Sequence, residues 1–236
     1  MRLAAAIPAF QAAASIGDVV RRTRDILPEV LVVDDGSSDG TGEAARAAGA
    51  EVATHLVNRG KGAALATAFR TLFDRGADAV VTLDADGQHL PEEIPKLLEA
   101  GRGDADLVLG TRDHLFAEMV AARRIANRLS SLAISWAAGS PLSDVQTGFR
   151  LYRRRLVEAT GLPEARFDAE SAVVVRAARR GFVIVTVPVR LGFADGRTTS
   201  HFRPLVDSLR IARSVVRARL DTRPEAGEDR LGHRPR

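Results

Sequence analysis

Two carboxylates and a side-chain amide follow an apolar run in the middle of the chain. The run VVTL at 80–83 leads into Asp84, Asp86 and Gln88. Carboxylates one residue apart repel each other unless a cation or a hydrogen-bond network compensates for their charge, and hard oxygen ligands suit Mg²⁺ or Mn²⁺. The spacing therefore predicts a divalent metal site with open positions for phosphate oxygens. The alternative is that Asp86 only forms a turn and caps a helix that begins at Pro91.

Chemically capable side chains also follow two earlier apolar runs and precede a helical pattern. Pro8 and Phe10 come after LAAAI, and Asp34 and Asp35 end the run EVLVVDD. Lys61 lies between two glycines, which let the backbone approach a ligand closely and leave the ammonium free to meet a diphosphate. This lysine motif lacks the upstream glycine and the following Ser or Thr of a P-loop, which argues against an ATPase.

A repeated strand and helix pattern positions these residues. Apolar or β-branched runs predict strands at 3–7, 29–34, 50–55, 79–84 and 105–110, and helical periodicity predicts helices at 14–27, 42–48, 61–75 and 91–100. The strands have no polar alternate face, as expected of parallel strands covered by helices on both sides. We therefore expect an α/β fold with a mostly parallel sheet, whose ligands bind outside the carboxyl ends of the strands.

The second half of the chain is less regular. We expect a helical region at 117–139, a turn and a short strand at 144–152, a helix at 168–180 and a strand at 182–191. The segment 203–220 predicts a basic amphipathic helix, and the polar residues 221–236 predict a disordered tail. One face of the predicted helix carries Leu205, Leu209, Ala212, Val216 and Leu220. This face either packs on the domain or lies on an anionic bilayer.

Composition narrows the function classes. The chain of 236 residues is 45% hydrophobic, which suffices for a sizeable core, and it has no cysteine for a disulfide or a thiolate metal site. Its formal net charge of +4 lies entirely in 203–236, where nine arginines stand against five acids, so 1–202 is neutral overall. We therefore expect no nucleic-acid partner. No run reaches the roughly 18 apolar residues of a membrane span.

The order of the motifs resembles glycosyltransferase family 2, the inverting enzymes with a GT-A fold. The segments IPAFQAAASIG, VLVVDDGSSDGT, NRGKGAALATAF and LDADGQH look like its first four blocks. DLVLGTR, RRIANRLSS and SDVQTGFRLYRR resemble the subgroup that transfers sugars to dolichyl or other polyprenyl phosphates, and the form DVQTGFR is similar to the dolichyl-phosphate glucosyltransferases. The resemblance covers about 3–213 and implies a Rossmann-like GT-A domain over 1–202.

The resemblance implies donor-binding roles for the strand ends. The nucleoside pocket would be lined by Pro8, Phe10, Asp34 and Asp35. Lys61 would meet the diphosphate, and Arg203 would replace a lysine that the subgroup has at this place. The alternatives are that Phe10 is a core aromatic and that the two aspartates only form a turn before a helix at Thr41.

The resemblance also assigns the metal. Asp84 would contact the ribose or the metal, Asp86 would be the direct ligand of Mg²⁺ or Mn²⁺ and a catalytic residue, and Gln88 would supply a further oxygen. His89 would either lie on the acceptor side or cap the turn.

On the acceptor side, Asp144 would orient or deprotonate the acceptor, and Gln146 would bond sugar hydroxyls. Arg112 and Arg124 match positions that bind the acceptor phosphate, which a guanidinium fork suits well. The alternatives are an aspartate that caps a turn and arginines on a solvated face.

These observations lead to one main hypothesis. We expect a metal-dependent, inverting transfer of a hexose from a nucleoside diphosphate sugar, with UDP-glucose as the expected donor, to polyprenyl or dolichyl phosphate at the cytoplasmic face of the membrane. The alternatives are a family 2 enzyme with a soluble or protein-bound acceptor, and a non-catalytic module that binds nucleotide sugars.

Overall fold

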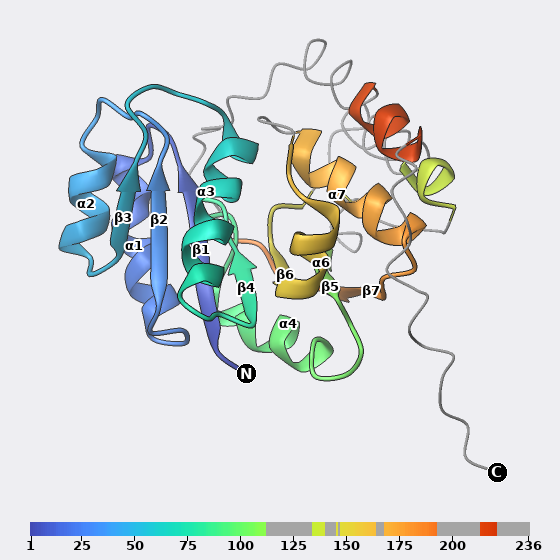
Figure 1. Ribbon diagram of the computed structural model, residues 1–236. Coiled ribbons are helices and arrows are strands. Elements are labelled where there is room, and N and C mark those ends of the chain that lie inside the picture. The colour runs from blue at the N-terminus through green and yellow to red at the C-terminus, as the bar shows by residue number, and fades with distance from the viewer. Residues whose placement is uncertain (112–133, 140–144, 146, 164–167, 193–212, 221–236) are drawn as a thin grey trace, which may run out of the picture.

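The structure is a computed structural model that describes residues 1–111, 134–139, 145, 147–163, 168–192 and 213–220. Strands and helices alternate through its first half, as the periodicity predicts (Figure 1). The strands there are β1 (Leu3–Ala9), β2 (Val30–Asp34), β3 (Glu51–Thr54) and β4 (Ala79–Thr82). The helices are α1 (Ala13–Arg24), α2 (Thr41–Ala47), α3 (Lys61–Asp74) and α4 (Ile94–Ala100), and the 3-10 turn η1 (Pro91–Glu93) precedes α4.

Within its described residues, the second half contributes three strands and the helices α6 and α7. The strands are β5 (Leu107–Thr111), β6 (Arg150–Arg153) and β7 (Ile184–Pro188), and the helices are α6 (Arg154–Thr160) and α7 (Asp168–Arg179). Residues 134–138 and 213–220 are also helical. The sequence did not predict α6, because this helix has only seven residues and begins with two arginines. Its few apolar residues therefore show no clear helical periodicity. The predicted tail at 221–236 and the first part of the predicted helix at 203–220 lie outside the described residues, and the boundaries at 202 and 220 stay predictions.

The seven strands found among the described residues form one sheet in the order β3-β2-β1-β4-β6-β5-β7. The pairs β1 with β2, β1 with β4, β2 with β3 and β5 with β7 are parallel. Strand β6 lies between β4 and β5 and runs antiparallel to both. The prediction of an α/β fold with a mostly parallel sheet is therefore confirmed. The antiparallel strand has a direct consequence, because its first residues lie at the same edge as the last residues of the parallel strands.

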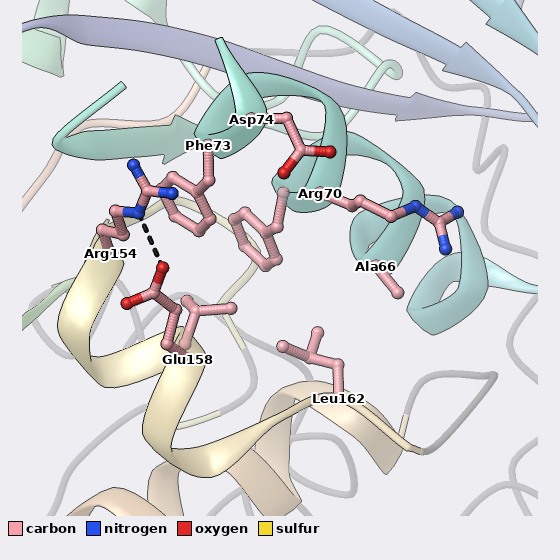
Figure 2. A pocket seen from close by; sticks show the side chains of 9 residues that line it. Ala66, Arg70, Phe73, Asp74, Arg154, Glu158 and Leu162 are labelled. Atoms are coloured by element: carbon pink, nitrogen blue, oxygen red, sulfur yellow. Dashed lines mark hydrogen bonds and ion pairs between the residues drawn. The ribbon is translucent and has the colours of Figure 1, made fainter. Parts of the chain in front are cut away.

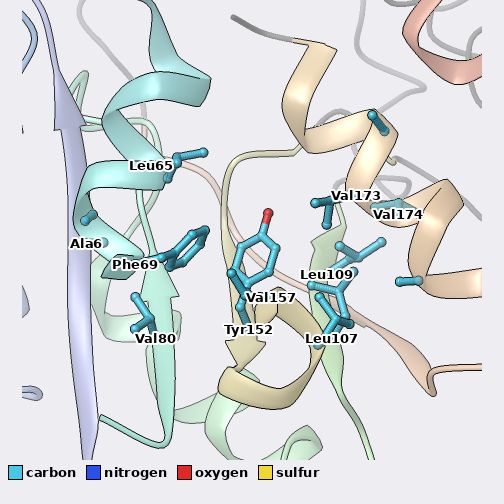
Figure 3. Packing of buried hydrophobic residues seen from close by; sticks show 14 of the residues in the cluster. Ala6, Leu65, Phe69, Val80, Leu107, Leu109, Tyr152, Val157, Val173 and Val174 are labelled. Atoms are coloured by element: carbon cyan, nitrogen blue, oxygen red, sulfur yellow. The ribbon is translucent and has the colours of Figure 1, made fainter. Parts of the chain in front are cut away.

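Helices cover both faces of the sheet, because successive strand residues point to opposite sides. On one face, Ala4 and Ala6 join a cluster with α3, α6 and α7, whereas on the other Ala5 and Ile7 join α1, α2 and α4. Figure 3 shows the first cluster, in which Phe69 of α3 points toward Tyr152 of β6. These rings lie edge to face with centroids 5.0 Å apart. The apolar runs without a polar face are thus explained by burial on both sides.

We expect the Phe69→Ala variant to lose about 3–5 kcal/mol of unfolding free energy, because it removes a fully buried ring and its contacts with Phe73 and Tyr152. Urea unfolding followed by circular dichroism measures the loss. The matched control is Leu56→Ala, whose side chain is 99% exposed and whose removal should cost less than about 0.5 kcal/mol. Equal losses in the two variants would contradict the packing described for this core.

Candidate functional site

The candidate site lies at the edge of the sheet where the parallel strands end and β6 begins. Asp34 ends β2, and Asp84 follows β4 by two residues. Gly148 precedes β6 by two residues, and the hydroxyl of Thr82 in β4 donates a hydrogen bond to its carbonyl oxygen at 2.8 Å. Lys61 begins α3 at the same edge. The topology therefore brings together side chains that are far apart in the sequence.

A cluster of three charged side chains, in which one lysine pairs with two carboxylates, forms the centre of the site. The Lys61 Nζ atom lies 2.6 Å from Asp84 Oδ1 and 2.8 Å from Glu170 Oε2, which belongs to α7. Burial by itself lowers the pKa of Lys61, but the two carboxylates outweigh this effect and hold the pKa above its ordinary value. Lys61 is therefore a firmly protonated cation beside the predicted metal ligand Asp84. The sequence predicted Lys61 and Asp84 but not Glu170.

Gly148 makes room for this ion pair. A Cβ atom at this position would lie 2.6 Å from Lys61 Nζ and 2.7 Å from both carboxylate oxygens of Asp84. These distances are well below a van der Waals contact, so any larger residue would displace the ammonium or the carboxylate. The glycine in the motif DVQTGFR is thus explained by close approach of two charged groups and not by backbone conformation.

A buried arginine holds the chain before β6 in place. Arg150 donates hydrogen bonds from Nη2 to the carbonyl of Val145 at 2.7 Å and from Nε to that of Thr147 at 2.7 Å. Its Nη1 atom donates to the backbone carbonyl of Glu170 at 2.8 Å and to the Tyr152 hydroxyl at 3.1 Å. Burial raises the pKa of Tyr152 to about 12 although Arg150 opposes the shift, so the phenol stays neutral. Arg150 is not among the predicted site residues, although it ends the motif DVQTGFR.

The turn after β4 presents the predicted metal ligands. The backbone N–H of Gln88 donates to Asp86 Oδ1 at 2.9 Å, and Gly87 between them has φ +77°. The turn that was the alternative for Asp86 therefore exists, but no side chain caps η1. The backbone N–H of Asp84 donates to His89 Nδ1 at 3.1 Å, and the His89 ring stacks on Phe149. His89 therefore braces this turn, and a role on the acceptor side stays a prediction.

The carboxylates at the end of β2 differ in what they contact. Asp35 is buried and accepts hydrogen bonds from the backbone N–H groups of Arg59 at 2.9 Å and Gly60 at 2.6 Å. It also contacts His55 Nδ1 at 2.6 Å. Asp35 thus fixes the loop that leads into Lys61, and a direct contact with a nucleoside stays a prediction for it.

Asp34 bonds within its own loop, where Oδ1 accepts the N–H of Ser37 at 3.0 Å. Its Oδ2 atom faces Gly42 at the start of α2. Pro8 and Phe10 lie at the carboxyl end of β1 and are partly exposed at the same edge of the sheet. These positions suit the predicted nucleoside pocket, and the contact itself stays a prediction.

The remaining predicted site residues lie outside the described residues. They are Arg112, Arg124, Asp144, Gln146 and Arg203. Their predicted roles at the acceptor phosphate, the sugar and the diphosphate stay predictions.

A cavity of about 240 Å³ lies between α3 and α6 and is separate from this site. Figure 2 shows Phe73 and Leu162 among its lining residues and the Arg154–Glu158 ion pair, 2.7 Å long, beside them. None of the described residues predicted to bind donor or metal lines it.

The side chains of the turn after β4 suit a divalent cation that is coordinated mainly by oxygen atoms of a bound substrate. Within the described ranges, no group of three His, Cys, Asp or Glu side chains is arranged to hold a metal ion by itself. Asp84 and Asp86 nevertheless have partly exposed carboxylates. The ion pair of Asp84 with Lys61 shows that this carboxylate accepts a positively charged partner. Mg²⁺ is commonly bound by one or two carboxylates together with substrate phosphates and water. Gln88 is also partly exposed in the same turn.

Comparisons with known proteins find a glycosyltransferase family model and similar glycosyltransferases. Residues 5–161 match the family model described as Glycosyl transferase family 2. The undecaprenyl-phosphate mannosyltransferase of Micrococcus luteus is 37% identical over 202 residues, which cover 80% of this chain and 83% of that protein. The polyprenol monophosphomannose synthase of Mycolicibacterium smegmatis is 30% identical over 234 residues, which cover 91% and 87%.

Among solved structures, the fold is similar to that of glucosyl-3-phosphoglycerate synthase from Mycobacterium tuberculosis in complex with Mn²⁺, UDP and phosphoglyceric acid. The TM-score is 0.68 at 22% identity, and the match covers 95% of this chain and 80% of that one. This likeness confirms the expected GT-A fold.

We expect Gly148→Ala to weaken the binding of UDP with Mn²⁺ by about tenfold or more, because the new methyl group displaces the charged ends of Lys61 and Asp84. The melting temperature should also fall, because pairing offsets the cost of burying Lys61, so the titration is made well below it. Calorimetric titration and thermal unfolding measure the two effects. The control is Gly103→Ala, where a Cβ atom meets nothing within 4 Å. Unchanged affinity in Gly148→Ala would show that the ion pair is not part of the binding site.

Proposed function

We propose, from the premise that this chain belongs to glycosyl transferase family 2, that it transfers a hexose from a nucleoside diphosphate sugar to a polyprenyl phosphate. The observation that carries the proposal is the Lys61–Asp84 pair beside Gly148, at the sheet edge where such folds bind nucleotides. The two bacterial relatives support the acceptor, because both are named for polyprenyl-linked mannose chemistry.

The donor sugar is the finer part of the proposal. The motif DVQTGFR favours glucose, and UDP-glucose is the donor predicted from the sequence. The names of the two relatives favour mannose instead, and further relatives are named for 4-deoxy-4-formamido-L-arabinose. We therefore propose a hexose donor and test UDP-glucose against a mannose donor directly.

The reaction needs little acid or base chemistry from the protein. An oxygen of the acceptor phosphate attacks the anomeric carbon while the bond to the leaving diphosphate breaks, and the configuration inverts. A polyprenyl phosphate is already ionised, so it needs no strong general base, and Asp144 would act by orienting the acceptor. Negative charge develops on the leaving diphosphate, and the Lys61 ammonium is the group of the described site that can meet it.

Asp84 and Asp86, with Gln88, would hold a divalent cation. When bound, Mg²⁺ or Mn²⁺ would neutralise further charge on the leaving group. The structural neighbour in complex with Mn²⁺ and UDP supports this part through its shared fold.

We also propose that the chain lies on the cytoplasmic surface of an anionic membrane. Within the described ranges, no helix combines the length and apolar character needed to cross a bilayer. In the helix at 213–220, Val215 and Ala218 pack into the core, whereas Val216 is 51% and Leu220 is 70% exposed. The two described residues of the predicted apolar face, Val216 and Leu220, are therefore both exposed.

Basic groups lie on the same helix, and one of them contacts an exposed aromatic ring. Arg213 and Arg217 are exposed on the same helix. Arg219 stacks on the ring of Trp136 at 4.2 Å and donates to its backbone carbonyl at 2.8 Å, and Trp136 is itself 65% exposed. A mixture of exposed Trp, aliphatic and Arg side chains suits the interface of an anionic bilayer.

We expect the purified protein, incubated with polyprenyl phosphate, Mn²⁺ and a panel of UDP-glucose, UDP-galactose and GDP-mannose, to form one polyprenyl phosphate hexose that mass spectrometry identifies. Asp86→Ala should lower turnover by about 10²–10³-fold, because it removes charge stabilisation of the leaving group. The control Asp104→Ala alters an exposed carboxylate in the loop before β5 and should leave turnover unchanged. Transfer only to a soluble phosphorylated acceptor would overturn the proposed lipid acceptor and favour a family 2 enzyme with a soluble acceptor.

We expect the protein to co-sediment with vesicles that contain anionic lipid at low salt and to be released as salt rises. The Arg213→Gln, Arg217→Gln double variant should bind about tenfold or more weakly, because each arginine contributes about 1 kcal/mol near such a surface. Val216→Ser, Leu220→Ser should also weaken binding, whereas Arg102→Gln, a 77% exposed arginine after α4, should not. Equal binding to neutral and anionic vesicles, or none to either, would overturn this part of the proposal.

A further inference from the structure

Glu170 is a buried carboxylate in the site for which the sequence predicts no role. It lies in the first turn of α7 and is 5% exposed. Its Oε2 atom contacts Lys61 Nζ at 2.8 Å, whereas Oε1 is buried without a hydrogen-bond partner and lies 3.9 Å from Arg150 Nε. A buried carboxylate oxygen without a hydrogen bond is costly, so its retention calls for an explanation.

The two carboxylates that share Lys61 differ in their access to solvent. The side chain of Asp84 is 32% exposed, whereas that of Glu170 is 7% exposed. Asp84 can therefore turn to a ligand that arrives from solvent, and Glu170 cannot. Among the four charged groups of this cluster, Lys61 and Arg150 carry two positive charges and Asp84 and Glu170 carry two negative ones, so removing the Glu170 charge leaves one positive charge in excess.

We propose that Glu170 is a positioning residue that keeps Asp84 available to a divalent cation by sharing the Lys61 ammonium and balancing its charge. The inference rests on the metal dependence in the proposed function. Without the Glu170 charge, the ammonium would pair with Asp84 as its remaining carboxylate partner in the described site. The same change would leave one uncompensated positive charge beside the cation site. Both effects oppose the binding of Mg²⁺ or Mn²⁺.

The same change has the opposite electrostatic effect on an anion. A cluster with one extra positive charge attracts a diphosphate at least as well as the balanced cluster does. A positioning role therefore predicts that cation affinity falls while metal-free UDP affinity is kept. A purely structural role predicts that both fall together, because a disordered site binds neither.

The test measures Mn²⁺ alone by the electron paramagnetic resonance signal of the free ion, and UDP in the presence of EDTA by calorimetry. We expect Glu170→Gln to lower Mn²⁺ affinity by about tenfold and to leave metal-free UDP affinity unchanged or higher. Glu170→Asp keeps the charge and should stay within about threefold of the parent. The control Glu158→Gln alters an exposed carboxylate on α6 and should change neither affinity.

Lys61→Met provides a second variant that does not depend on the folding of Glu170→Gln. It removes the ammonium that pairs with Asp84, so Mn²⁺ affinity should rise while UDP affinity falls. The double variant Lys61→Met, Glu170→Gln should recover the Mn²⁺ affinity that Glu170→Gln loses.

Parent-like Mn²⁺ affinity in both Glu170→Gln and Lys61→Met, or a parallel loss of Mn²⁺ and UDP binding in Glu170→Gln, would overturn the inference and leave the proposed function standing. A parent protein that binds no Mn²⁺ and transfers sugar without metal would overturn both the metal dependence and this inference.

Discussion

A buried ammonium group between two carboxylates sets the conditions that the surrounding structure meets. Removing Lys61 from water is costly, and its pairing with Asp84 and Glu170 offsets the cost only at hydrogen-bonding distance. The three residues come from the start of α3, the turn after β4 and the first turn of α7. The sheet and the helices α3 and α7 must therefore keep fixed positions relative to one another. The hydrophobic core that holds them in place thus contributes to the stability of the ion pairs in the site.

Arg150 extends this constraint to the chain that enters β6. Its guanidinium donates to backbone carbonyls on both sides of the site and has no contact with solvent. Backbone groups held in this way do not need to reorganise when a ligand arrives, which is the condition for effective electrostatic stabilisation. Asp35 does the same for the loop before α3, since it accepts two backbone N–H groups there. The charged side chains of Arg150 and Asp35 at this edge thus fix the backbone of the protein.

The features that the sequence predicted are local, and those that it missed depend on packing. An apolar run that ends in carboxylates shows directly that Asp84 lies at a strand end, and the alternation of runs shows the layered fold. Glu170 gives no such sign, because its approach to Lys61 depends on how α7 crosses the sheet. The C-terminal helix shows the same limit, since helical spacing grouped Val216 with Leu220 but could not tell that Val215 and Ala218 supply the buried contact. The antiparallel direction of β6 likewise follows from pairing between distant strands.

The antiparallel strand also fixes the alignment of residues across the site. The pairing of β6 with β4, from Thr82 opposite Arg150 to Ala79 opposite Arg153, fixes where Gly148 stands against Asp84. A shift of this register by one residue would move Gly148 away from Asp84 and bring a residue that carries a Cβ atom against the ammonium of Lys61. The order of backbone hydrogen bonds in the sheet thus decides whether two opposite charges can meet at its edge.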